Sequence, residues 1–147
     1  MTATRQLCIF SLDEQLFGIE VARVQEVLRH QEMTPVTLAP RVIRGLINLR
    51  GQIVMAIDLR QCLGLRPIDR EQAPMNLVVR TEDGPVSFLV DRIHDVVDLA
   101  ENTFEPPPTN LQGAHRRLIR GTYPLREQLL LALDTDALLN LIDSSPS

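Results

Sequence analysis

The sequence predicts an all-β protein made of two small antiparallel barrels that pack together. Short apolar stretches recur along the 147 residues, and turns that contain glycine or proline separate them. The second half of the chain also repeats the residue pattern of the first half. We expect each set of strands to close into a barrel, because closure removes the exposed strand edges that invite aggregation.

The chain begins with a predicted hairpin. Leu7–Leu12 is an apolar stretch of strand length, and Asp13–Gln15 is polar and suits a turn. In Phe17–Val21, apolar residues alternate with glycine or glutamate, which is typical of a half-buried strand. Two such strands joined by a short turn predict an antiparallel pair.

The segment after this hairpin is ambiguous. Residues 24–28 fit the period of a strand and also one face of a helical turn, and we favour the strand. Residues 31–41 are expected to form a loop, because Pro35 and Pro40 cannot donate to a strand ladder.

Arg50 and Gly51 interrupt the most apolar part of the chain. Leu46–Leu49 and Gln52–Ile57, on either side of them, read as strands. Glycine can adopt a positive φ, so the arginine-glycine pair is short enough to form a tight connection. We therefore expect Arg50 at the tip of a hairpin.

A short helix is predicted after these strands. Asp58 can cap its first turn, and Leu59, Cys62 and Leu63 share one face. Gly64 is expected to end it, because glycine tolerates the left-handed backbone conformation.

The second half of the chain follows the same plan. Asn76–Arg80 and Val86–Val97 are predicted strands, with a turn at Glu82–Gly84 between them. Pro67–Pro74 is a polar connector, and Pro106–Pro108 is an extended linker that cannot join a central strand.

The similarity between the two halves of the chain indicates an internal duplication. Residues 42–65 align with residues 118–141 without a gap at a shift of 76 (120 − 44). Residues 21–27 align with residues 90–96 at a shift of 69 (95 − 26). The matched positions include arginines, a glycine and an aspartate, so apolar composition alone does not explain the agreement.

Composition and charge exclude several classes of protein. No apolar stretch approaches the roughly 18 residues of a membrane span, and Met1–Leu12 lacks a leader pattern, so we expect a cytoplasmic protein. A net charge of −4 and an aromatic content of 3% argue against nucleic-acid binding. Most charged residues in Arg41–Arg70 are arginines, and most of those in Glu82–Glu105 are acidic. This separation of charge is consistent with two surfaces that bind different protein partners, and equally with an ordinary solvated surface.

The chain lacks recognisable catalytic, metal-binding and cofactor-binding motifs. His30, His94 and His115 are scattered and lack the spacing of metal ligands. Cys8 and Cys62 sit in apolar stretches and are predicted to be buried, reduced thiols. There is no nucleophile elbow, phosphate-binding glycine loop or dinucleotide fingerprint, so we expect neither an enzyme nor a cofactor.

One combination of motifs is specific. Its members are Phe17–Val21, Val24–Val27, Ile43–Gly51, Ile57–Arg60, Val86–Asp95, Glu105–Pro108 and Leu133-Asp134. Together they resemble the CheW family of bacterial chemotaxis coupling proteins over roughly residues 6 to 142. The Asn-Leu-Arg-Gly block that ends at Gly51 is the most specific part of the resemblance.

The resemblance implies two tandem five-stranded SH3-like β-barrels that share a core, with short capping helices. We expect a single CheW-like domain over residues 1–147, with barrel subdomains at approximately residues 16–75 and 85–142. The N-terminal strand and the middle strands are expected to be exchanged between the two subdomains.

The resemblance also implies a non-enzymatic adaptor. Such an adaptor joins the cytoplasmic tips of chemoreceptors, the methyl-accepting chemotaxis proteins, to the regulatory domain of the CheA histidine kinase in membrane-embedded receptor arrays. No receiver, phosphotransfer or ATP-binding segment accompanies the motifs, which favours a stand-alone coupling protein without direct membrane insertion.

A receptor-binding site is implied around the predicted hairpin tip. An arginine held there is a pre-oriented fork for a carboxylate or a carbonyl group. By resemblance, Arg50 matches the arginine of the family's receptor groove, Glu26 matches an acidic residue beside it, and Val24 lies on the apolar wall. We expect Glu26 and Arg50 to form an ion pair. The receptor-binding candidates are Val24, Glu26, Asn48, Arg50 and Gly51.

Two further expectations concern positions outside this group. Gly45 matches a family position associated with kinase coupling, although a close-packing glycine explains it equally well. The duplication places Asp95 and Arg126 at the positions of Glu26 and Arg50, so we expect a second pair there. Pro124 removes a ladder donor close to that tip, which makes the rim of the second barrel less certain to match the first.

Two other functions fit the sequence. An adaptor of a different chemosensory array, with surface motility or second-messenger output, would carry the same motifs. A small-ligand-binding β-barrel is the third alternative, but the sequence lacks a convergent polar cluster for it.

Overall fold

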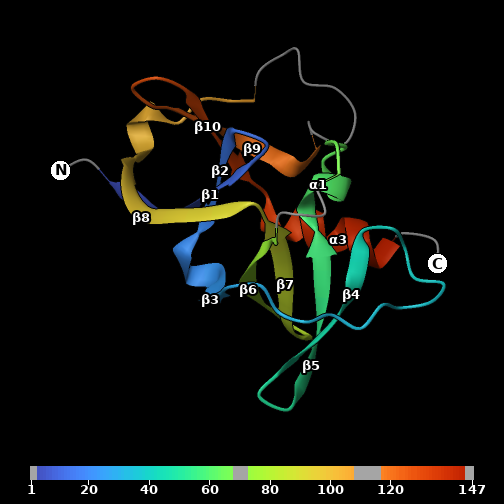
Figure 1. Ribbon diagram of the computed structural model, residues 1–147. Helices are drawn as coiled ribbons and strands as arrows, with labels where there is room; N and C mark the ends of the chain where they lie inside the picture. The colour runs from blue at the N-terminus through green and yellow to red at the C-terminus, as the bar shows by residue number, and fades with distance from the viewer. Residues whose placement is uncertain (1–2, 68–72, 108–116, 145–147) are drawn as a thin grey trace.

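The chain forms two five-stranded sheets in the computed structural model, which describes residues 3–67, 73–107 and 117–144 (Figure 1). The first barrel contains, in spatial order, β3 (Val24–Leu28), β6 (Met75–Thr81), β7 (Gly84–Val90), β5 (Gln52–Asp58) and β4 (Ile43–Leu49). The second barrel contains β8 (Arg92–Ala100), β1 (Thr4–Leu12), β2 (Gln15–Glu20), β10 (Leu129–Leu133) and β9 (Ile119–Pro124). These sheets confirm the predicted all-β fold class.

Both barrels have the same strand pairing. In each, an edge strand, β3 or β8, pairs antiparallel with the first strand of a hairpin, β6–β7 or β1–β2. The second strand of that hairpin then pairs in parallel with β5 or β10, which in turn pairs antiparallel with β4 or β9. Each barrel therefore combines a hairpin from one half of the chain with three strands from the other half.

Short helices follow or connect the strands. Among the described residues they include η1 (Val21–Arg23), α1 (Leu59–Cys62), η2 (Glu101–Thr103) and α3 (Thr135–Ser144). Val21 was expected in a strand but lies in η1, because the chain leaves the second barrel after Glu20 and crosses to the first barrel there. Gly64 has a φ of +68° after α1, as predicted.

The two longer helices begin with equivalent aspartate caps. Asp58 Oδ1 accepts a hydrogen bond from the backbone N–H of Gln61 at 3.2 Å, and Asp134 Oδ1 accepts one from the N–H of Ala137 at 3.0 Å. Both donors and both acceptors are related by the shift of 76 residues. The capping role predicted for these aspartates is confirmed.

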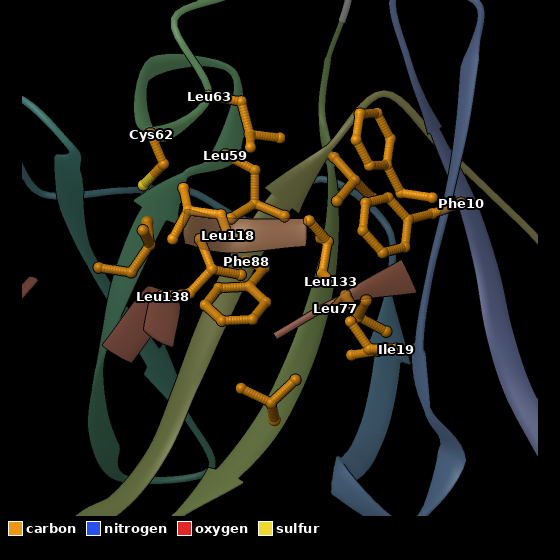
Figure 2. Packing of buried hydrophobic residues seen from close by; sticks show 14 of the residues in the cluster. Phe10, Ile19, Leu59, Cys62, Leu63, Leu77, Phe88, Leu118, Leu133 and Leu138 are labelled. Atoms are coloured by element: carbon orange, nitrogen blue, oxygen red, sulfur yellow. The ribbon is translucent and has the colours of Figure 1, made fainter. Parts of the chain in front are cut away.

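A shared apolar core lies between the barrels (Figure 2). Each barrel also has a small core of its own. Among the buried residues of the shared core are Phe10, Ile19, Leu59, Leu77, Phe88, Leu118, Leu133 and Leu138. Cys8 and Cys62 are free and buried in it, and burial raises the pKa of the Cys62 thiol to about 12. Cys62 is therefore an unreactive core residue.

Parts of three predicted features lie outside the described residues. These parts are residues 68–72 of the polar connector, Pro108 of the proline linker, and His115.

Candidate partner-binding site

Arg50 lies in a two-residue turn between β4 and β5. Leu49 pairs with Gln52, and the φ angles of Arg50 and Gly51 are +53° and +88°. Positive φ at both central residues defines the type I′ turn that suits the twist of a hairpin. Asn48 Oδ1 accepts a hydrogen bond from the backbone N–H of Gly51 at 2.8 Å. Asn48 and Gly51 therefore build the turn that presents Arg50.

Glu26 holds the arginine in a bidentate ion pair. Arg50 Nη1 donates to Glu26 Oε2 at 2.7 Å, and Nη2 donates to Oε1 at 2.5 Å. The Arg50 side chain is 70% exposed, whereas that of Glu26 is 19% exposed. Hydrogen bonding to Arg50 lowers the pKa of Glu26, and hydrogen bonding to Glu26 raises the pKa of Arg50. Both groups are therefore charged at neutral pH.

This pair lies on the rim of the first barrel. Glu26 is on β3, at one end of the strand order, and Arg50 follows β4, at the other end. Val27, next to Glu26 on β3, is 43% exposed. A fixed cation on a rim that also exposes an apolar side chain can bind a protein segment through charge-assisted hydrogen bonds and apolar contacts.

Val24 and Gly45 occupy different environments. Val24 is half-buried against the shared core, and its carbonyl accepts a hydrogen bond from Arg80 Nη1 at 2.6 Å. Gly45 is buried in β4, where a Cβ atom would lie 2.8 Å from the carbonyl oxygen of Thr34. Thr34 and Leu46 exchange two backbone hydrogen bonds of 2.8 Å beside it. Gly45 therefore allows the 31–41 loop to pack against β4.

The predicted pair between Asp95 and Arg126 is absent. Both side chains are exposed, and no hydrogen bond or ion pair between described residues joins them. Unlike their counterparts in the first turn, Arg126 and Glu127 do not have positive φ. Glu127 replaces the glycine of the first turn and Pro124 replaces its asparagine, so the backbone that aims the arginine is not repeated.

Sequence reasoning missed a polar network at the junction of the barrels. Arg60 on α1 donates from Nε to Asp91 Oδ1 at 2.8 Å and also pairs through Nη2 with Oδ2. Asp91 Oδ2 accepts the backbone N–H of Asp13 at 2.8 Å, and Arg60 Nη1 donates to the carbonyl of Arg66 at 2.9 Å. Hydrogen bonding to Asp91 raises the pKa of Arg60. The only sequence signal was that Arg60 belongs to the Ile57–Arg60 motif.

The described part of the chain offers little for chemistry. It contains no group of three or more His, Cys, Asp or Glu side chains placed to hold a metal ion. His94 Nε2 lies 3.2 Å from Ser11 Oγ, a local contact. Each barrel encloses an apolar cluster, and the first barrel also holds the buried side chains of Asn76 and Ser87, where Ser87 Oγ donates to Asn76 Oδ1 at 2.8 Å. None of the described helices is long and apolar enough to cross a membrane.

Comparison with protein families identifies the chain. The CheW-like domain model matches residues 6–143. The chain belongs to the CheW-like domain family. Chemotaxis protein CheW of Thermotoga maritima is 31% identical over 133 residues, which cover 90% of this chain and 86% of that protein. Chemotaxis protein CheW of Treponema pallidum is 29% identical over 139 residues, which cover 92% and 82% of the two chains.

A solved CheW structure has the same architecture. The crystal structure of scaffolding protein TtCheW from Thermoanaerobacter tengcongensis matches with a TM-score of 0.80 and 26% identity, over 90% of each chain. CheW-family proteins are non-catalytic scaffolds of chemotaxis, and membership of this family supports a chemotaxis adaptor.

Proposed function

We propose that this CheW-family protein couples the cytoplasmic tips of chemoreceptors to the CheA histidine kinase in membrane-associated receptor arrays. The Glu26–Arg50 ion pair carries the proposal, because it fixes an exposed arginine on a rigid turn at the positions that resemble the family's receptor groove. Arg50 binds a carboxylate or carbonyl group of the receptor, and Glu26 orients the guanidinium group.

The other candidates support this contact in different ways. Asn48 and Gly51 maintain the turn, and Val24 packs beneath the rim. Gly45 acts on kinase coupling indirectly, because a side chain at that position would push the 31–41 loop away from β4. The kinase contact then depends on the shape of this loop and strand.

Charge reversal at Arg50 tests the receptor contact. The binding of wild type and Arg50→Glu to a receptor cytoplasmic hairpin, and separately to the CheA regulatory domain, is measured by isothermal titration calorimetry. We expect Arg50→Glu to weaken receptor binding by about tenfold or more, as at an interface hot spot, and to leave kinase binding unchanged. Circular dichroism establishes that both proteins are folded.

The second barrel supplies a matched control. Arg126 is also an exposed arginine at a hairpin tip, at the equivalent position of the repeat, but it lacks a carboxylate partner among the described residues. Arg126→Glu should bind the receptor like wild type, and Glu26→Arg combined with Arg50→Glu should recover part of the lost affinity. Equal losses in Arg50→Glu and Arg126→Glu would show a general charge effect and contradict the proposed site.

A further inference from the structure

A groove lies beside α3, at the end of the shared core. It has a volume of about 510 Å³, and β5, the β6–β7 turn, η1 and α3 contribute its walls. Its apolar lining comes from Ile53, Met55, Ile57, Pro85, Val86, Leu139 and Ile142. We call it the α3 groove.

The floor of the α3 groove is an apolar stripe that emerges from the core. Ile57, Met55 and Ile53 alternate along β5 and share one face of the strand. Ile57 is fully buried in the shared core, Met55 is half-buried against it, and Ile53 is 62% exposed. Val54 and Ala56, on the opposite face, fill the interior of the first barrel. The stripe therefore extends beyond the surface that α3 covers.

The sheet is also open at this point. The parallel register between β5 and β7 begins where Ala56 pairs with Ser87 and ends at Asp58 and Leu89. Pro85 lies two residues before this register and has no backbone N–H to extend the ladder. The N-terminal parts of β5 and β7 therefore line the groove without being paired to each other.

The rim of the α3 groove is acidic. Glu82 and Asp83 are exposed in the β6–β7 turn, and their carboxylates form no ion pair with the described residues. Arg23 also lines the groove, but it pairs there with Asp136 at 2.9 Å, and Arg80 Nη1 donates to backbone carbonyls. The rim therefore has a net negative charge, in contrast to the fixed cation at the tip of the β4–β5 hairpin.

We propose that the α3 groove is a docking site for a positively charged protein segment that carries apolar side chains. The apolar side chains of the segment cover Met55 and Ile53, and its lysines or arginines face Glu82 and Asp83. The proposal goes beyond receptor coupling through Arg50 and does not depend on it. It gives the acidic part of the chain a partner of opposite charge.

The test uses a fluorescein-labelled peptide of leucine and lysine, with a leucine and glutamate peptide for comparison. Fluorescence anisotropy is recorded for the full chain, Ile53→Ser, and Glu82→Gln combined with Asp83→Asn. We expect Ile53→Ser to weaken binding of the lysine peptide by about tenfold, and the charge variant to weaken it in a salt-dependent manner. The glutamate peptide should bind far more weakly than the lysine peptide.

Matched controls come from the second barrel. Leu129→Ser removes an apolar side chain of 41% exposure from β10, and Asp98→Asn removes an exposed acid from β8. Both should bind the lysine peptide like wild type. Equal binding by all variants, or equal losses in the groove and control variants, would overturn the proposal. Sedimentation that shows a dimer, and its loss in Ile53→Ser, would also overturn the proposal, because the groove would then hold a second copy of this chain.

Discussion

The two barrels share one strand topology but differ at their hairpin tips. In the first barrel, Arg50 and Gly51 form a type I′ turn, and Glu26 holds the arginine. In the second barrel, Arg126 occupies the equivalent position in a turn without positive φ, and Asp95 does not reach it. A duplicated arginine is therefore not a duplicated site, because the turn residues and the length of the acidic side chain also have to be repeated.

The junctions between the barrels differ in a related way. Arg60 on α1 pairs with Asp91 where β7 meets β8, and the pair is largely buried. At the equivalent helix position, Asp136 on α3 pairs with Arg23 in η1, with the charges reversed and the aspartate exposed. One junction thus depends on a desolvated pair and the other on a solvated pair.

The largest expected effect is at the buried junction. Asp91→Ala leaves the Arg60 guanidinium without its carboxylate in a desolvated site and should lower the free energy of unfolding by about 3 kcal/mol. Asp136→Ala removes a solvated pair and should cost about 0–1 kcal/mol. Urea denaturation measures both losses. Similar losses at the two junctions would contradict the difference between them.

A somewhat smaller effect is expected at two equivalent glycines. A Cβ atom on Gly121 would lie 2.4 Å from the carbonyl oxygen of Glu105 and 2.3 Å from the ring of Phe104, whereas one on Gly45 would lie 2.8 Å from the carbonyl oxygen of Thr34. Gly121→Ala should therefore destabilise the protein by about 2 kcal/mol and Gly45→Ala by about 1 kcal/mol. Thermal unfolding of the two variants measures both losses. A larger loss in Gly45→Ala than in Gly121→Ala would show that the segment packed on β9 shifts more easily than the loop packed on β4.

The hairpin tips themselves can be interchanged. Asn48→Pro combined with Gly51→Glu gives the first tip the residues of the second, and a glutamate at a φ of +88° should cost about 1–2 kcal/mol. The new turn should also separate Arg50 from Glu26, so the pKa of Glu26 should rise toward its ordinary value in an NMR titration. Pro124→Asn combined with Glu127→Gly is the control, and it should leave the pKa of Glu26 unchanged. A low pKa that persists in the first variant would show that the pair does not need its turn.

The smallest effect is the pH dependence contributed by the rim. Because the folded protein lowers the pKa of Glu26, the pair contributes stability above the unfolded carboxyl pKa of about 4.3, and this contribution is lost as the pH falls through the lower folded value. The difference in urea midpoint between wild type and Glu26→Gln should therefore be largest near neutral pH and shrink in acid. A constant difference across this range would exclude the ion pair as its source.

Local features of the chain were predictable from the sequence. The Arg50-Gly51 turn, the Asp58 cap and the end of the helix at Gly64 depend on a few neighbouring residues, and all three are present. The duplication also indicated two similar barrels.

Features that depend on distant packing were not predictable. Arg60 meets Asp91 only because α1, the β1–β2 turn and the β7–β8 junction come together in the fold. The pair expected at Arg126 failed because alignment transfers a residue but not the backbone angles that aim its side chain.

The exchange of hairpins has a consequence for synthesis of the protein on the ribosome. The strands β3, β4 and β5 emerge early, but their barrel is incomplete until β6 and β7 have also emerged, up to Val90. The β1–β2 hairpin remains without all of its neighbouring strands for longer, because β2 pairs with β10, which ends at Leu133. For most of translation the nascent chain therefore exposes apolar strands without their partners, and the strands of the first barrel are complete before those of the second.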